Sequence, residues 1–191
     1  WEEILQVYEK IVEDQPQDDY YSHQDFVIAS LYVLQPPVRA DYANMKIFVD
    51  DVYVPKGCSD NYCVLQTNPR FVFHKFKNAK QKGTTIVPIC DELHDILLVW
   101  MDRNPTDYIL TSYIACRKQY YPMTLSKRLP IIFTRYGGKP VTINTLRHSF
   151  ISYQSKHDQD FHHKQSNADK MMHTPYMADM YRRKVYPSST K

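Results

Sequence analysis

Four short stretches of the sequence hold residue types that suit chemistry on a phosphodiester. In chain order they contain Arg39 after a Pro-Pro turn, Lys77 in a lysine-rich segment, Arg147 within Leu-Arg-His-Ser-Phe, and His173 with Tyr181 eight residues later. Paired arginines can clamp non-bridging phosphate oxygens and neutralise the charge that builds in a transition state. A lysine can protonate a departing oxygen, and a tyrosine hydroxyl can act as a covalent nucleophile. The residue types therefore indicate transfer of a phosphoryl group.

The charge of the chain is divided unequally along its length. The net charge is +3, but residues 1–111 carry −7 and residues 112–191 carry +10. Within the acidic part, a basic island without any acid consists of Arg70, Lys75, Lys77, Lys80 and Lys82. Concentrated positive charge suits a phosphate backbone, whose contacts are electrostatic and sensitive to salt. A solvated face is the alternative explanation, so charge favours nucleic acid without establishing it.

Other classes of function are disfavoured by what the sequence lacks. It has only four glycines and contains neither GxGxxG nor GxxxxGK[ST], so dinucleotide-binding and P-loop chemistry are not expected. No apolar run approaches the ~20 residues of a membrane-spanning helix, so we expect no membrane partner. Four cysteines are too few and too scattered for a disulfide scaffold, and they indicate reduced thiols inside a cell.

Two clusters have residue types that ligate metal ions. Cys58 lies close to Cys63 in sequence, and Cys90 with His94 could suggest the corner of a zinc site, but no second close pair completes a set of four ligands. A polar stretch contains the other cluster, whose residue types suit a divalent metal in a nuclease: His157, Asp158, Asp160, His162 and His163. A solvated loop would not preorganise these ligands, so we predict neither a metal ion nor another cofactor.

Hydrophobic periodicity predicts a mostly helical α+β protein. Apolar residues at helical spacing predict helices over residues 2–13, 23–34, about 93–100, 108–120 and 124–135, and a linker over 14–22. Three β-rich runs predict a small three-stranded antiparallel sheet, over residues 62–66, 71–76 and 84–89. The second turn of this sheet carries the lysines of the basic island.

The last third of the chain contains three signals for the start of a helix. Thr142 precedes an apolar-periodic run that contains Arg147. Ser166 with Asp169 has the spacing of a capping box. Thr174 followed by proline is an N-cap with proline at the first helical position. These signals predict three helices, with Arg147 inside the first, His173 at the end of the second and Tyr181 inside the third.

The order of these features resembles the catalytic domain of the tyrosine recombinases, also called the phage-integrase family. Leu146 to Phe150 resembles the second arginine box of that family, and Met172-His173-Thr174-Pro175 followed by a tyrosine resembles its closing box. The resemblance covers about residues 23–186. Departures from the bacterial pattern suggest the variants found in integrases of viruses and virus-like mobile elements of eukaryotes.

The resemblance implies one catalytic domain over residues 1–191, with its core at 23–186. Residues 1–22 would form an N-terminal helix and linker, and residues 187–191 a tail. The family's separate N-terminal DNA-binding domain would be absent from this fragment, which is consistent with a start at Trp1 rather than Met. The expected fold is the tyrosine-recombinase catalytic fold.

The resemblance also implies a role for each candidate residue. Arg39 and Arg147 would clamp the phosphate, and Lys77 would protonate the 5′ oxygen, with Lys75 and Lys80 as alternates. Tyr181 would form a 3′-phosphotyrosyl link, which conserves the phosphodiester energy so that rejoining needs neither ATP nor metal. His173 would bond to the phosphate or seat the tyrosine. The rivals of Tyr181 on the same segment are Tyr176 and Tyr186.

Two positions depart from the family's pattern. Asn144 stands three residues before the second arginine, where the family usually has histidine. An asparagine donates a hydrogen bond but does not accept a proton at neutral pH, which leaves the general base in doubt, with His148 as a substitute. Tyr42 stands three residues after Arg39, where the family often has an acid; Asp41 could orient Arg39 instead.

The implied partner is double-stranded DNA. The predicted DNA-binding residues are Arg70, Lys75, Lys80, Lys82, Arg182 and Arg183, and the residues from 182 onward could pack on a neighbouring subunit. We expect a homo-tetramer on DNA and a monomer or dimer when free. The sequence leaves the location open among a host nucleus, a cytoplasmic viral factory and a virion. Two alternatives to recombination remain: relaxation of DNA as by a type IB topoisomerase, and an inactive DNA-binding or assembly module.

Overall fold

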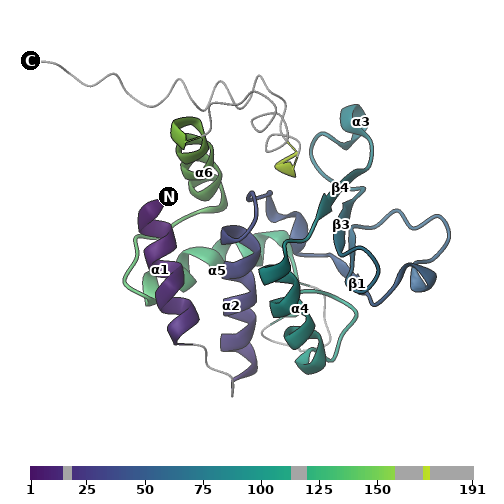
Figure 1. Cartoon of the computed structure of the whole chain (residues 1–191), viewed down its shortest axis with the longest axis horizontal. Coiled ribbons are helices and arrows are strands. Elements are labelled where there is room, and N and C mark those ends of the chain that lie inside the picture. The colour runs from purple at the N-terminus through teal and green to yellow at the C-terminus, as the bar shows by residue number, and fades with distance from the viewer. Residues whose placement is uncertain (15–18, 113–119, 158–169, 173–191) are drawn as a thin grey trace, which may run out of the picture.

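The computed structural model describes residues 1–14, 19–112, 120–157 and 170–172. These residues form a mostly helical body with a small sheet on one side (Figure 1). Several predictions lie outside the described residues. They are the capping box at Ser166, the N-cap at Thr174, the metal-ligand types from 158 to 163, and the site residues His173, Tyr181, Arg182 and Arg183.

The first two helices form as their periodicity predicts. Helix α1 (Glu2–Glu13) buries one apolar face, from Ile4 to Ile11, against the rest of the core. Helix α2 (Tyr20–Val33) begins three residues before the predicted start, because the Asp19 side chain caps it by accepting a hydrogen bond from the Ser22 amide at 2.8 Å. From His23 to Val33, α2 is buried all round, so it is the central helix of the molecule.

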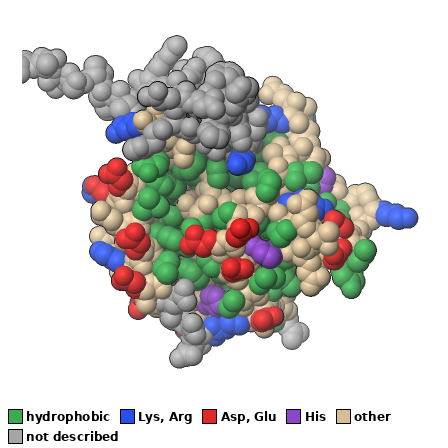
Figure 2. All heavy atoms as spheres, in the orientation of Figure 1, with side chains coloured by type: hydrophobic (Ala, Val, Ile, Leu, Met, Phe, Trp, Pro, Cys, Tyr) green, Lys and Arg blue, Asp and Glu red, His purple; other side chains and the backbone are tan. Residues whose placement is uncertain are grey.

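Two more helices pack on α2. Helices α4 (Asp91–Arg103) and α5 (Pro122–Arg135) lie beside it in Figure 1. A buried carboxylate, that of Asp25 on α2, joins α2 to α5: Arg128 donates to it through Nε and Nη2 at 2.7 and 2.5 Å, and Arg135 donates at 3.2 Å. On the face shown in Figure 2, acidic side chains spread across this helical body.

The sheet has four strands in the order β1-β2-β3-β4. The three predicted strands are confirmed and antiparallel: β2 (Tyr62–Val64), β3 (Arg70–Phe73) and β4 (Thr85–Pro88). The sequence prediction missed the fourth, β1 (Lys46–Phe48), which pairs parallel with β2. Three residues are too few for alternation to show, so β1 becomes visible only through its partner.

The connection between β3 and β4 is the lysine hairpin, residues 74–84. It was predicted as a polar turn, but it contains a short helix, α3 (Ala79–Lys82). Gly83 ends this helix at a φ of +69°, a left-handed conformation that glycine adopts without steric cost. Across the base of the hairpin, the His74 ring Nδ1 and the Thr84 hydroxyl lie 2.9 Å apart.

The predicted helix over 108–120 is wrong for residues 108–112. Tyr108 instead forms an isolated antiparallel bridge with Lys46, and the Ile109 amide donates to the Met45 carbonyl at 2.9 Å. The Gln24 side chain accepts a hydrogen bond from the Thr111 amide at 2.7 Å. The apolar residues of this segment are buried as expected, but its main chain bonds to distant segments rather than to its own preceding turn.

Helix α6 (Ile143–His157) carries residues 146–150, the Leu-Arg-His-Ser-Phe stretch. The Thr142 hydroxyl accepts a hydrogen bond from the Thr145 amide at 3.1 Å, which confirms the predicted start. In Figure 1, α6 and α3 stand at the same end of the molecule, where α2 also ends. Among the described helices none has both the length and the apolar character needed to cross a membrane.

Candidate active site

The first arginine lies in a tightly held turn at the end of α2. The arginine turn, residues 36–42, begins with two prolines and ends in the 3₁₀ helix η1 (Ala40–Tyr42). The Tyr32 hydroxyl, from the last turn of α2, donates to the Arg39 carbonyl at 2.8 Å. The fully buried ring of Tyr42 packs edge-on against that of Tyr32, with centroids 5.6 Å apart. The backbone at Arg39 is thus fixed, while its side chain is half-buried.

The second arginine is buried inside the protein. Arg147 on α6 is only 1% exposed. It donates to the Pro37 carbonyl at 3.0 Å and to the Met171 carbonyl at 3.4 Å. A buried guanidinium needs such acceptors, because a charge without them is expensive in an apolar interior. Arg147 therefore fastens α6 to the arginine turn and to residues 170–172, which immediately precede His173 in sequence.

Asp41 lies in the electrostatic field of both arginines. Burial raises the pKa of its carboxyl to about 6, although the charges of Arg147 and Arg39 both act to lower it. Among the described residues, Oδ2 of Asp41 is buried and accepts no hydrogen bond. Asp41 thus interacts electrostatically with both arginines, while the expectation that it orients Arg39 stays a prediction.

The neighbouring tyrosines share this low-dielectric setting. Burial raises the pKa of the Tyr32 and Tyr42 hydroxyls well above their ordinary value, and the nearby Asp41 carboxylate raises both further. The Tyr32 hydroxyl consequently stays protonated and keeps its hydrogen bond to the Arg39 carbonyl at any pH at which the protein would work. The arginine turn and α6 thus form a preorganised cationic site with one carboxylate.

Three further candidate residues lie within the described part of the chain and are exposed or half-buried. Asn144 is exposed on the first turn of α6, and His148, next to Arg147, is half-buried. Lys77 is exposed on the lysine hairpin, directly before the short α3. The structure thus brings Arg39, Asp41 and Arg147 together and leaves Lys77 exposed on the lysine hairpin.

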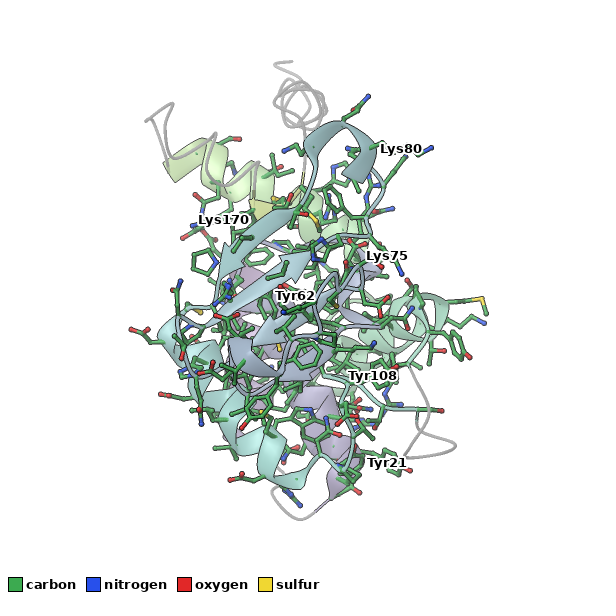
Figure 3. The ribbon with its side chains drawn as sticks, turned by 90° about the vertical axis from the view of Figure 1, so that its right-hand side faces the viewer. Tyr21, Tyr62, Lys75, Lys80, Tyr108 and Lys170 are labelled. Atoms are coloured by element: carbon green, nitrogen blue, oxygen red, sulfur yellow. The ribbon has the colours of Figure 1, made fainter. Side chains whose placement is uncertain are left out.

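The predicted DNA-binding residues fall into two groups. Arg70, at the start of β3, forms an ion pair with Asp51 and donates to the Thr67 and Asn68 carbonyls at 3.0 Å each, so its donors are used within the protein. Lys80 is exposed near the tip of the lysine hairpin, and Lys75 lies lower on the same side (Figure 3). Lys82, at the end of α3, is half-buried.

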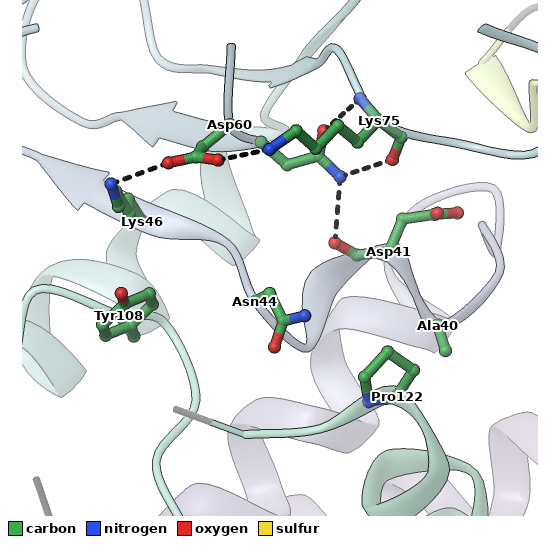
Figure 4. Close-up of a pocket in the computed structure, with 9 residues that line it drawn as sticks. Ala40, Asp41, Asn44, Lys46, Asp60, Lys75, Tyr108 and Pro122 are labelled. Atoms are coloured by element: carbon green, nitrogen blue, oxygen red, sulfur yellow. Dashed lines mark hydrogen bonds and ion pairs between the residues drawn. The ribbon is translucent and has the colours of Figure 1, made fainter. Parts of the chain in front are cut away.

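Lys75 belongs to a small charge network at the surface. The Asp60 carboxylate accepts from Lys75 at 2.7 Å and from Lys46 at 2.8 Å. These two hydrogen bonds lower the pKa of Asp60 to about 2, so it stays ionised. The network lines a cavity of about 250 Å³ that extends to Asp41 in the arginine turn (Figure 4).

Sequence reasoning missed Asn61, which lines the same cavity. Asn61 is 8% exposed, and its side-chain amide is bonded to main-chain groups of the arginine turn and of the lysine hairpin. An asparagine before a strand ordinarily indicates a turn, so nothing in the sequence distinguishes this one. Its role becomes visible only when the fold places two distant segments beside it.

The cysteine positions show ordinary packing. Burial raises the pKa of the Cys63 thiol, and the Cys90 thiol donates to the Leu34 carbonyl at 3.7 Å. The His94 Nε2 lies 2.7 Å from the Leu65 carbonyl, so it carries the proton and donates. Over the described ranges, no three histidine, cysteine or acidic side chains gather as metal ligands would.

Comparisons with known proteins identify the fold. No protein-family model matches the chain, and no curated protein sequence matches it. Among solved structures, XerA recombinase is similar with a TM-score of 0.64 at 17% identity, covering 98% of this chain and 58% of that one. Lambda integrase(75–356), solved as a dimer bound to a COC′ core site, gives a TM-score of 0.55 at 16% identity, covering 100% of this chain and 61% of that one.

A second structure of the lambda integrase dimer on a COC′ core site gives a TM-score of 0.53 at 15% identity, covering 98% of this chain and 49% of that one. The chain therefore spans between about half and three fifths of the length of these proteins. The described helices and the four-stranded sheet have a fold similar to the tyrosine-recombinase catalytic fold, as the sequence predicts.

Proposed function

We propose that this chain is the catalytic part of a DNA recombinase or integrase that cuts and rejoins strands through a phosphotyrosyl intermediate. The observation that carries the proposal is the convergence of two arginines on one carboxylate. Arg147 bonds to the arginine turn across 110 residues of sequence, and both Arg147 and Arg39 act on Asp41. XerA recombinase and lambda integrase share the fold in which this convergence occurs.

In this proposal the two arginines bind the scissile phosphate. The hydrogen bonds of Arg147 to two main-chain carbonyls fix the direction of its guanidinium before the substrate arrives. Such preorganisation is what makes charge stabilisation effective, because little reorganisation is needed as the transition state forms. Arg39, half-buried beside it, supplies the second cation. Asn144 donates a hydrogen bond to the phosphate, and His148 is the remaining candidate for the general base.

Cleavage then proceeds as a balanced exchange of two phosphorus–oxygen bonds. The Tyr181 oxygen attacks phosphorus and gives its proton to a general base, for which His148 is the candidate. The bond from phosphorus to the 5′ oxygen breaks, and Lys77 supplies the proton that the 5′ oxygen takes up. His173 follows Met172 directly in sequence, and the carbonyl before Met172 is bonded to Arg147. That adjacency favours His173 as the further phosphate ligand. Attack by a 5′ hydroxyl of a partner strand reverses the step and rejoins the DNA.

Double-stranded DNA is the proposed partner. The lambda integrase structures contain a core site, and the exposed Lys80 of this chain lies on a hairpin with further cations, Lys75, Lys77 and Lys82. Arg182 and Arg183 would extend the contact beyond the tyrosine. Rejoining to a different strand requires several subunits on DNA, so we propose a homo-tetramer there. A virus or a virus-like mobile element is the proposed source of such an enzyme.

The proposal is tested by trapping the intermediate. A nicked suicide duplex, with a sequence that the protein selects from a random pool, is incubated with the protein in EDTA and run on a denaturing gel. The expected result is a covalent protein–DNA band that Tyr181→Phe abolishes. Tight DNA binding without any covalent band would contradict the proposed activity and favour the inactive binding module. In a separate assay, relaxation of a supercoiled plasmid by the monomer alone would favour the topoisomerase.

A further inference from the structure

We propose that Asn61 is a positioning residue that sets where the lysine hairpin stands relative to the arginine turn. The inference rests on the proposed function, because it concerns how Lys77 reaches the phosphate that Arg39 and Arg147 hold. It goes beyond that function, because it proposes that the buried side-chain amide of Asn61, which takes no part in the chemistry, positions the proton donor.

The side chain of Asn61 bonds to both segments at once. Its Nδ2 donates to the Lys75 carbonyl at 2.9 Å and, over a longer 3.4 Å, to the Asp41 carbonyl. Its Oδ1 accepts from the His74 amide at 2.9 Å and from the Lys75 amide at 2.8 Å.

The position requires an amide. Asn61 must donate to two carbonyls on one side and accept from two amides on the other, and only an asparagine or glutamine side chain offers both. A carboxylate would place a negative oxygen against two carbonyl oxygens. Because Asn61 is 8% exposed, water would not relieve that repulsion. We call the four hydrogen bonds of the Asn61 side chain the amide clip. Asn61→Asp therefore removes the donors of the clip while keeping the size of the side chain.

The clip acts on the main chain, two residues before Lys77. Both the amide and the carbonyl of Lys75 are bonded to Asn61, which fixes the path by which β3 enters the hairpin. The Asn61 carbonyl in turn accepts from the Lys46 amide at 3.0 Å, so the clip is anchored to β1. By contrast, Asp60 contacts Lys75 through the lysine side chain alone, and both partners are well exposed to solvent.

A role limited to stability and a role in aiming Lys77 give different results with a modified substrate. When sulfur replaces the bridging 5′ oxygen, the thiolate leaves without being protonated, so loss of the proton donor no longer slows cleavage. A variant in which Lys77 is misplaced should therefore cleave the sulfur substrate at close to the wild-type rate. A defect in folding or in phosphate binding slows both substrates equally.

The control is a matched asparagine elsewhere in the fold. Asn104, after α4, also bonds to main-chain groups on both sides: its Nδ2 donates to the Tyr108 carbonyl at 2.6 Å, and its Oδ1 accepts from the Thr106 amide at 3.1 Å. These bonds join neighbouring residues of one loop rather than two segments of the site. Asn104→Asp thus tests the loss of a structural amide clip without moving the hairpin.

The experiment measures single-turnover cleavage of the oxygen and sulfur versions of the selected suicide duplex. Asn61→Asp and Asn61→Ala should slow the oxygen substrate by about 10- to 100-fold, the scale of a misplaced catalytic group. With the sulfur substrate, both variants should cleave at a rate within about threefold of the wild-type rate, and Lys77→Ala should do the same. Asn104→Asp should show no difference between the two substrates in its rate relative to the wild type. Hydrogen exchange should be faster in residues 74–83 of Asn61→Asp than in the wild type, with α2 unchanged.

Two results would overturn the inference, and they differ in what else they remove. In the first, the wild type cleaves, and the Asn61 variants cleave both substrates more slowly by the same factor or cleave both at the wild-type rate. Asn61 then has no part in aiming Lys77, while the proposed function stands. If the wild type cleaves neither substrate, the proposed function fails and the inference fails with it.

Discussion

The positive charge beside the arginine turn is buried, whereas most positive charges of the lysine hairpin are exposed to solvent. Arg147 is buried and fastened to two carbonyls, whereas Lys77 and Lys80 are exposed on a short connection between strands. A buried, preorganised cation suits the stabilisation of a fixed phosphate. An exposed lysine suits DNA contact and proton delivery, which need access to the substrate. The contrast predicts that loss of Arg147 damages chemistry most and that loss of the hairpin tip damages mainly affinity.

The largest effect is expected at Arg147. Arg147→Ala should reduce the rate of adduct formation by at least about 10²–10³-fold, because a preorganised donor to the transition-state charge is lost. Arg147→Lys keeps the charge but not the paired donors, and it should recover only part of the rate. Circular dichroism establishes that each variant is folded. Cleavage near the wild-type rate in a folded Arg147→Ala would remove the arginine site from the account.

Removal of the proposed proton donor comes next. Lys77→Ala should slow cleavage by about 10²-fold or more, since general acid catalysis contributes on that scale. DNA affinity should change by less than about threefold, because one phosphate contact is a small part of the total. Lys80→Ala serves as the neighbouring control. Equal losses of rate and affinity in Lys77→Ala would make Lys77 a phosphate contact only.

Asp41 should make stability depend on pH. Its pKa is raised from 3.8 to about 6, so folding favours the protonated carboxyl, and the wild type should lose stability as the pH rises from about 4 through 6. Asp41→Asn removes this loss and should gain on the order of 2 kcal/mol relative to the wild type between pH 4 and pH 7.5. Urea unfolding at several pH values measures the difference. Parallel curves would show that the carboxyl is not held in this way.

The smallest effect is expected at the hairpin tip. Lys80→Ala should weaken DNA binding uniformly across sequences and reduce the slope of log affinity against log salt by about one. The rate of cleavage at saturating DNA should remain within about twofold, because Lys80 serves binding. A salt titration by fluorescence anisotropy measures the slope. An unchanged slope would place DNA on another face of the molecule.

The sequence predicts the five longer helices of the described residues. Apolar residues at helical spacing predict α1, α2, α4, α5 and α6, although α2 is buried all round rather than along one stripe. The pairing of Arg39 with Arg147 came from the resemblance to the recombinases, and the association with Asp41 follows from its place beside Arg39. The burial of Arg147 agrees with its apolar neighbours on α6.

What the sequence could not predict depends on bonds between distant segments. Strand β1 is only three residues long. Residues 108–112 have apolar residues at helical spacing, but their main chain forms hydrogen bonds with Met45 and Gln24 instead of a helix. Asn61 is invisible for the same reason, since its partners are main-chain groups of two segments that only the fold brings together. Side chains that bond to main chain leave no pattern of residue types to find.

The most direct test of the account is to locate the DNA on the protein. After trapping on the suicide duplex, trypsin and a nuclease leave a nucleotide on one peptide. Residues 171–182 form a peptide with Tyr176 and Tyr181, and Tyr186 falls in another peptide, over residues 185–191. Fragmentation by mass spectrometry should place the nucleotide on Tyr181. A nucleotide on Tyr176 or Tyr186, or on no tyrosine at all, would contradict the proposed site.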